Sequence, residues 1–236
     1  MNTIKKYSSN KMVSVLKKDG ICISDGNKKL GTIHSFSLPS INTCPGKSKL
    51  CSNLCYAVKY EKVYVSTNKA YTRNFNLLQN NMSFVERKLN EFFKVYSEKH
   101  NQFRIHVAGD FYSYKYTKMW RRIIKKNRNI NFTAYTRSWR IPEILKVLKE
   151  INDFKNTKLF LSVDKETGIP IFGNWNLAYL SENDDDKPIF PVTIVFRNKT
   201  NTVQTKINNS TVCPYEMGFK HSKKINCLKC MLCYIK

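Results

Sequence analysis

The chain has 236 residues, of which 42% are hydrophobic and 13% aromatic, and this composition excludes a disordered tail and suits one folded domain over residues 1–236. It has no run of eighteen apolar residues and no apolar segment within residues 1–11, so we expect neither a membrane span nor a secretory signal, but a cytoplasmic protein. The 41 Lys and Arg residues against 17 Asp and Glu give a net charge of +24, which predicts a polyanionic partner such as nucleic acid, unless the composition only reflects an AT-rich genome.

The first third of the chain predicts a β-hairpin, a cysteine loop and a helix. Two apolar runs within residues 21–36 flank the turn signal Asp25-Gly26. A loop over residues 38–55 follows and carries three cysteines. The capping box Ser83-x-x-Glu86 then predicts the start of a helix whose broad apolar face extends to Tyr96.

Strands and helices then alternate along the chain. We expect strands at 103–108, 131–136, 158–163 and 191–196, helices at 116–127 and 142–151, and a long loop at 168–187. The first three strands begin about 27 residues apart, the length of one βα unit. Repeated βα units predict an α/β fold with a mainly parallel sheet, either open and doubly wound or curved into a full or partial TIM-like barrel.

Seven of the eight cysteines form two groups. Three lie in the loop at Cys44, Cys51 and Cys55. The other four lie in a short C-terminal segment, residues 205–236, which is too small to fold without a metal or the main body to pack against. They are Cys213, Cys227, Cys230 and Cys233. Without a secretory signal, such grouping indicates metal ligation rather than disulfide bonds.

The spacing of the last three cysteines, C-x2-C-x2-C, is typical of ferredoxin-type iron–sulfur clusters. A remote Cys-Pro commonly supplies the fourth ligand, and both Cys44-Pro45 and Cys213-Pro214 qualify. We therefore expect one or two clusters of the four-iron type. Zinc is the alternative, because Cys227-x2-Cys230 is also a zinc spacing, although three cysteines at two-residue steps suit one tetrahedral ion poorly.

The division of ligands between clusters stays open. In one solution the loop cysteines hold a cluster whose fourth iron is vacant or closed by another group, and the four C-terminal cysteines hold a second cluster. Cys22 lies in an apolar run and is expected to be a small buried side chain.

Polar residues follow three predicted strands, at the ends where parallel α/β folds collect their sites. We expect Gly109 to allow close approach of a cofactor, Asp110 to hydrogen-bond a ribose or an amine, and Arg137 to hold a carboxylate or phosphate. Asp164 ends the third strand and joins this group. The alternative is that Asp110 and the nearby Ser113 cap a helix, with Arg137 at the surface.

The helix at 116–127 is expected to have an apolar stripe and a basic face. Few acidic residues are interleaved with its cations, and Arg140 lies beside Trp139, which would suit phosphate contact with base stacking. The alternative is an ordinary solvated surface. The predicted nucleic-acid-binding residues are Lys118, Arg121, Arg122, Lys125, Lys126, Arg128 and Arg140.

Several segments resemble the phage and plasmid "gene product eighty-eight" domain family. The run 36–39 before Cys44-Pro45-Gly46 looks like the opening of that domain, residues 104–113 resemble its central signature, and residues 132–137 and the closing cysteines also fit. The resemblance covers residues 30–233. It implies a phage or mobile-element protein acting in a bacterial cytoplasm, without specifying an activity.

A cysteine loop after an early strand is also similar, more distantly, to radical S-adenosylmethionine enzymes, although the spacing here is C-x6-C-x3-C instead of C-x3-C-x2-C. That likeness implies S-adenosylmethionine as a further cofactor and a radical-type enzyme acting on nucleic acid or on a factor bound to it. Two rival hypotheses are a non-enzymatic, metal-stapled DNA- or RNA-binding module, and a host-takeover protein that binds a bacterial protein.

Overall fold

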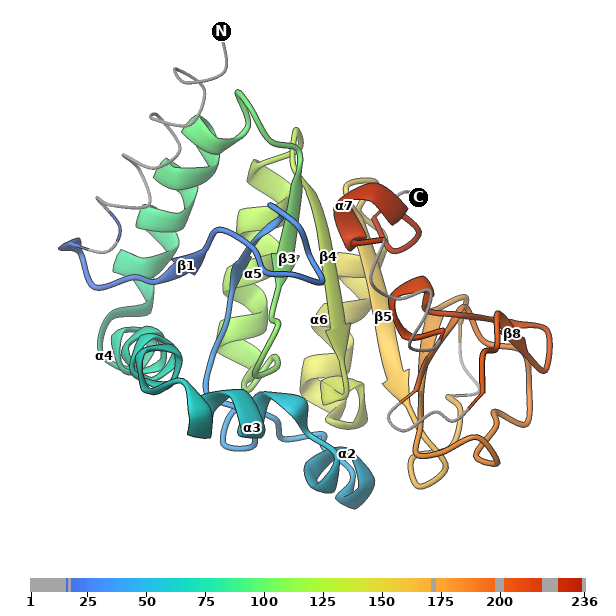
Figure 1. Ribbon diagram of the computed structural model, residues 1–236. Coiled ribbons are helices and arrows are strands. Elements are labelled where there is room, and N and C mark those ends of the chain that lie inside the picture. The colour runs from blue at the N-terminus through green and yellow to red at the C-terminus, as the bar shows by residue number, and fades with distance from the viewer. Residues whose placement is uncertain (1–15, 17, 171–172, 198–201, 218–224, 235–236) are drawn as a thin grey trace, which may run out of the picture.

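A computed structural model describes residues 16, 18–170, 173–197, 202–217 and 225–234, which fold around one nine-stranded sheet (Figure 1). The strand order is β1-β2-β3-β4-β5-β6-β7-β9-β8. The edge strands β1 and β8 run antiparallel to their neighbours, and the other strands pair in parallel. The bounds are β1 Ile23–Ser24, β2 His34–Phe36, β3 Gln102–Ile105, β4 Asn131–Thr136, β5 Thr157–Val163, β6 Asn176–Ser181, β7 Ile194–Arg197, β8 Lys206–Ile207 and β9 Ser210–Val212.

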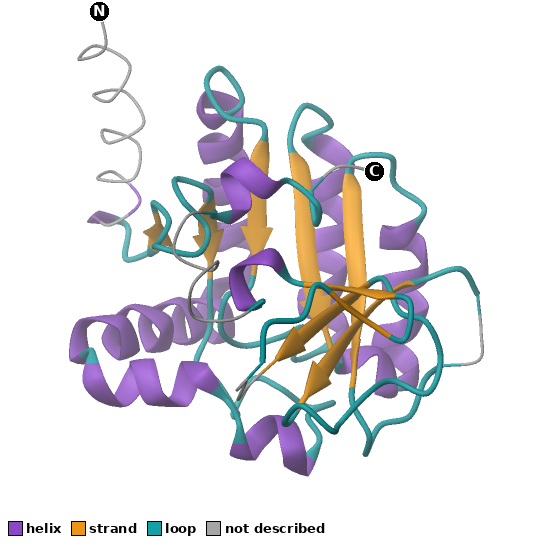
Figure 2. Cartoon of the chain, turned by 45° about the vertical axis from the view of Figure 1, so that its right-hand side comes forward, coloured by secondary structure: helices purple, strands orange, loops and turns teal. Residues whose placement is uncertain are grey.

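The second half of α4 (Val65–Tyr96), after its break at Asn81, lies with α5 (Tyr114–Lys126) and α6 (Pro142–Asn152) against one face of the sheet, while the first half of α4 runs in another direction (Figures 1 and 2). Ser113 begins α5 by accepting a hydrogen bond from the backbone N–H of Tyr116 at 3.3 Å. The apolar stripe expected on this helix is confirmed, because each of its members is fully buried: Tyr116, Met119, Trp120, Ile123 and Ile124.

Alternate residues of the strands meet these helices in an aromatic core. Phe103 of β3 and Phe132 of β4 lie with their ring centroids 4.8 and 5.1 Å from that of Phe93 of α4. Each fully buried ring of this kind stabilises the fold by about 1.5–3 kcal/mol relative to an exposed one. The core therefore fixes α4 against the strands that the site uses.

The C-terminal segment lies on the opposite face of the sheet. Thr133 and Lys158 alternate with core-facing residues of β4 and β5, and they donate side-chain hydrogen bonds to the carbonyl oxygens of Cys233 at 3.1 Å and Leu232 at 2.9 Å. This segment contains the 3-10 turn η2 (Pro214–Glu216) and the short helix α7 (Cys227–Cys230). The two faces of the sheet thus have different partners.

The cysteine loop predicted over residues 38–55 contains a short helix, α2 (Lys49–Asn53), and a second helix, α3 (Tyr56–Val63), directly follows it. Both helices lie near the carboxyl ends of β3, β4 and β5 (Figure 1). The 3-10 turn η1 (Ser138–Arg140) directly follows β4 at the same edge. Among the described residues, none of the helices combines the length and apolar character that a membrane crossing demands.

The mixed α/β fold with a mostly parallel sheet is confirmed, and so is the hairpin, since Ile23 pairs with Phe36. A TIM-like barrel is not confirmed, because the described strands form an open sheet with β1 and β8 at its edges. The strands also follow one another without the reversal of order that a doubly wound sheet has.

Two local predictions are wrong. The stretch 168–187 is not only a loop, because it contains strand β6. The capping box at Ser83 does not begin a helix, since α4 already starts at Val65. The break in α4 is at Asn81, whose side chain accepts a hydrogen bond from the backbone N–H of Phe84 at 3.0 Å. Asn81 therefore does the capping that the sequence pattern assigned to Ser83.

Candidate metal centres

The loop cysteines lie at the carboxyl edge of the sheet. Ser48 begins α2 by accepting a hydrogen bond from the N–H of Cys51 at 2.9 Å, and Cys55 directly precedes α3. Burial raises the pKa of the Cys44 thiol, and the nearby Asp110 carboxylate and the other two loop cysteines raise it further. Burial also raises the pKa of Cys51, while the Arg137 guanidinium opposes that rise. The three loop thiols thus share one neighbourhood with Asp110 and Arg137.

A buried ion pair joins this loop to the strand ends. Arg137 Nη1 lies 2.6 Å from Asp164 Oδ2, in a geometry that is not that of a hydrogen bond. The same carboxylate oxygen accepts a hydrogen bond from Ser48 Oγ at 2.6 Å, and Asp164 Oδ1 accepts two more from the backbone N–H groups of residues 166 and 167. Arg137 is buried, so the alternative that placed it at the surface is wrong, while its binding of a carboxylate or phosphate ligand stays a prediction.

Asp110 ties two strand ends together. Its Oδ2 accepts hydrogen bonds from the N–H groups of Arg137 at 2.8 Å and Ser138 at 3.2 Å, and its Oδ1 accepts one from Phe111 at 2.7 Å. Burial raises the pKa of the Asp110 carboxyl, and these hydrogen bonds oppose the rise. The alternative prediction, that Asp110 and Ser113 cap a helix, is thus right for Ser113, which caps α5. Asp110 instead accepts hydrogen bonds from the backbone of the loop after β4.

Two glycines let the cysteine loop pack tightly on these strand ends. A Cβ at Gly109 would lie 2.7 Å from Leu38 Cβ and 2.6 Å from Thr43 Oγ1. A Cβ at Gly46 would lie 1.9 Å from the carbonyl oxygen of Arg137. The space beside Gly109 is filled by residues of the cysteine loop, and close approach of a cofactor to this glycine stays a prediction.

The second cysteine group lines one pocket on the other face of the sheet. Cys213, Cys227, Cys230 and Cys233 all contribute to its wall. The N–H of Cys213 donates to the carbonyl of Val195 at 2.9 Å, and the N–H of Cys227 donates to that of Lys29 at 2.7 Å. The sequence did not decide with which cysteines Cys213 shares a site, and in the structure it lies with Cys227, Cys230 and Cys233.

Two cationic side chains, Lys29 and Arg104, lie near the C-terminal cysteine group. Lys29 forms an ion pair with Glu216 and lies 4.8 Å from the centroid of the Phe196 ring. Burial lowers the pKa of Lys29, but Glu216 and Cys213 more than offset it, so the pKa is raised overall. Arg104 lies 4.0 Å from the centroid of the Tyr135 ring. Its charge opposes the burial that raises the pKa values of Cys227 and Cys233.

Sequence reasoning missed both of these cations. Arg104 had a usable signal, because it is a charged residue between two core residues of a strand and must therefore face the other side of the sheet. Lys29 had none, since it lies in the hairpin turn and meets Glu216 only through the fold.

All eight cysteines are free thiols, and metal ligation by the two cysteine groups stays a prediction. Burial raises the pKa of Cys213 to about 12, with Lys29 opposing the rise, and metal binding requires the deprotonated form. Within the described residues, no three His, Cys, Asp or Glu side chains are spaced to hold a single metal ion. Cys22 is half-buried rather than buried, and it lies in neither group.

The predicted nucleic-acid face on α5 is partly neutralised. Arg122 forms two hydrogen bonds with Glu86 of α4, at 2.6 and 2.8 Å, and Arg121 lies 2.5 Å from Glu150 of α6. The expectation of few acidic partners is therefore wrong for these two cations, because the acids come from other helices. Arg140 is also engaged, donating to the carbonyl oxygens of residues 46 and 47 in the cysteine loop.

The remaining cations of that predicted face are exposed: Lys118, Lys125, Lys126 and Arg128. The ammonium of Lys118 lies 5.2 Å from the centroid of the Tyr114 ring on the same helix. Nucleic-acid binding by this face stays a prediction.

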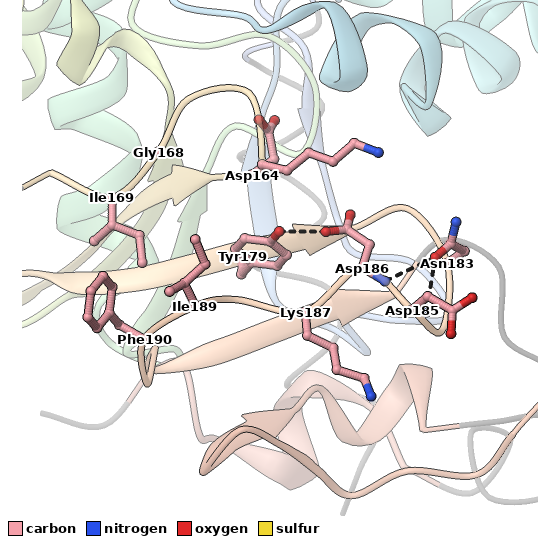
Figure 3. A pocket seen from close by; sticks show the side chains of 11 residues that line it. Asp164, Gly168, Ile169, Tyr179, Asn183, Asp185, Asp186, Lys187, Ile189 and Phe190 are labelled. Atoms are coloured by element: carbon pink, nitrogen blue, oxygen red, sulfur yellow. Dashed lines mark hydrogen bonds between the residues drawn. The ribbon is translucent and has the colours of Figure 1, made fainter.

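A cavity of about 580 Å³ lies beside Asp164 (Figure 3). Apolar side chains of Ile169, Ile189 and Phe190 form part of its wall, and Tyr179 and Asp186 form another part, joined by a hydrogen bond of 2.6 Å. No sequence pattern indicated this cavity, because most of its wall comes from residues 168–187, which were expected to form a loop. Asp164 connects it to the loop-cysteine neighbourhood.

Comparisons with known proteins agree with the resemblance seen in the sequence. The profile of a family described as Gene product 88 matches residues 9–235. The chain is 34% identical over 121 residues to the Gene 88 protein of Mycobacterium phage L5, covering 48% of this chain and 51% of the relative. It is 31% identical over 150 residues to the Gene 88 protein of Mycobacterium phage D29, covering 60% and 61%.

The chain thus spans about half to three-fifths of the length of these curated relatives. It has no match among solved structures, and the similarity to radical S-adenosylmethionine enzymes gains no support. Since the family profile spans nearly the whole chain and both relatives are bacteriophage proteins, the chain belongs to the gene product 88 family.

Proposed function

We propose that this chain is an iron–sulfur protein whose four C-terminal cysteines, Cys213, Cys227, Cys230 and Cys233, hold one cluster. The observation that carries the proposal is that cysteines from two separate segments line a single pocket beside two cations. A four-iron cluster with four thiolates carries a net charge of about −2. Arg104 supplies compensating positive charge on this face, and Lys29 supplies only part of its own, because Glu216 forms an ion pair with it.

A cluster suits this pocket better than a zinc ion. Zinc needs its four ligands around one centre, and three cysteines at two-residue steps suit one tetrahedral ion poorly. In an iron–sulfur cube each thiolate binds a different iron atom, so the sulfur atoms stand further apart. The C-x2-C-x2-C run also matches the ferredoxin pattern.

The loop cysteines are proposed to hold a second cluster at the carboxyl edge of the sheet. Cys44, Cys51 and Cys55 supply three thiolates, and the Arg137 guanidinium favours the thiolate form of Cys51. Three thiolates leave one iron atom for another group, and the cavity beside Asp164 offers room for a small molecule. S-adenosylmethionine as that molecule stays a prediction. Such clusters supply one-electron transfer when bound.

The test removes each group separately in anaerobically reconstituted protein. Cys227→Ser/Cys230→Ser and Cys51→Ser/Cys55→Ser should each lose about half of the absorbance at about 400 nm and about four iron atoms per chain. Cys22→Ser is the matched control, because Cys22 belongs to neither group, and it should retain the wild-type iron content. Protein that takes up zinc but no iron, or equal iron loss in the Cys22→Ser control, would refute the proposal.

A further inference from the structure

The first turns of the α3–α4 region carry a row of exposed tyrosines. Tyr56, Tyr60 and Tyr64 recur at four-residue intervals, so they lie along one side of α3 and its C-cap. Their exposed fractions are 54%, 57% and 52%. Aromatic rings this exposed contribute little hydrophobic stabilisation to the fold. Three of them in one row are typical of a surface that binds a partner.

The row has a defined geometry. The rings of Tyr60 and Tyr64 stack with centroids 5.7 Å apart and planes inclined by 24°, and the ring of Tyr56 stands at 83° to that of Tyr60. The Tyr56 hydroxyl donates to the carbonyl oxygen of Val107, next to the end of β3. One end of the row is therefore anchored to the sheet.

The exposed charges around the row are positive. Lys59 and Lys62 of α3 and Lys69 near the start of α4 are exposed. The acidic residue of α3, Glu61, points elsewhere, because its carboxylate accepts a hydrogen bond from the N–H of Ser40 at 2.9 Å. On α5, by contrast, Arg121 and Arg122 are already paired with carboxylates.

We propose that this row, Tyr56, Tyr60 and Tyr64 with Lys59, which follows Tyr56 by three residues on the same side of α3, binds single-stranded nucleic acid, independently of any metal. Aromatic faces stack on unpaired bases whatever their sequence, and lysines alongside contact the phosphates. The chain's charge of +24 complements such a polyanion. This places the nucleic-acid contact on α3 rather than on the basic face of α5.

The test measures the binding of a fluorescein-labelled oligothymidylate of about twenty nucleotides by anisotropy, with the full chain. Tyr60→Ala/Tyr64→Ala should weaken binding at least about tenfold, since each lost stack is expected to cost about that much or more. Tyr60→Phe/Tyr64→Phe keeps both rings and should bind within about twofold of wild type. Lys59→Ala should lower the slope of log affinity against log salt by roughly 0.7, and Lys59→Ala/Lys62→Ala should lower it little further, because Lys62 lies on the other side of α3.

The matched control is Lys125→Ala/Lys126→Ala, which removes the same charge from α5 and should weaken binding much less than the alanine variant of the tyrosines. Unchanged affinity in Tyr60→Ala/Tyr64→Ala would overturn the proposal and would favour a protein partner for the row. An equal loss in the phenylalanine variant would also overturn it, because the rings would then not be the binding element. The iron content of every variant should equal that of wild type, so the outcome is independent of the cluster proposal.

Discussion

The buried polar residues at the strand ends act first on the protein's own backbone. Asp110 accepts three backbone hydrogen bonds. Asp164 accepts two backbone hydrogen bonds and one from the Ser48 hydroxyl, and it also forms an ion pair with Arg137. Sequence reasoning placed these residues together correctly, because the ends of neighbouring parallel strands share an edge. The sequence could not show that these carboxylates accept hydrogen bonds from the protein's own backbone, because the donors lie in loops that carry no recognisable sequence motif.

His106 gives a residue-scale prediction. It is buried beside Tyr116, whose hydroxyl lies 2.7 Å from its Nε2 atom, and burial together with the charge of Arg104 lowers its pKa from 6.5 to about 3. Between these pH values the unfolded chain binds a proton that the folded chain excludes. The stability that this neutral histidine contributes is therefore complete above pH 6.5 and is lost as the pH falls toward 3.

We expect the free energy of unfolding of wild type to fall more steeply with acid in this window than that of His106→Gln, which has no proton to gain. Urea unfolding at a series of pH values between about 4 and 7 measures both slopes. Parallel curves for the two proteins would show that His106 does not carry this pH dependence.

At the scale of elements, the regular βα alternation could be predicted and the exceptions could not. The helices α5 and α6 and the strand β4 follow from apolar periodicity, which local sequence records directly. Strand β6 was missed because its short run, Asn176–Ser181, lies between glycines and a cluster of acidic residues that resemble loop. The early start of α4 was missed because its first turns are largely exposed and lack an apolar stripe.

The packing of the cysteine loop on β4 gives an element-scale prediction. Gly46→Ala would place a methyl group against the backbone carbonyl of Arg137, which cannot move aside as the end of a flexible side chain could. We expect the free energy of unfolding to fall by about 2–3 kcal/mol or more, measured by urea titration. The control is Gly168→Ala, whose added Cβ meets nothing within 4 Å and which should cost only about 1 kcal/mol for its left-handed backbone. Equal losses would mean that the loop does not approach β4 this closely.

For the whole molecule, the sequence identified both cysteine groups, and the fold determines their surroundings. Lys29 and Glu216 are 187 residues apart in sequence and meet beside Cys213. The two groups lie in different environments: one at the carboxyl edge of the sheet and one on the face opposite the helices. Such long-range pairings depend on tertiary packing, which is why no local pattern predicted the cations that balance the C-terminal thiolates.

The most direct test of the cluster proposal is the content of iron, acid-labile sulfide and zinc in anaerobically purified wild-type protein. Two clusters predict about eight iron and eight sulfide per chain, and a C-terminal cluster alone predicts about four of each. Zinc at about one or two atoms per chain with neither iron nor sulfide would contradict the proposal and assign the cysteines a structural zinc role.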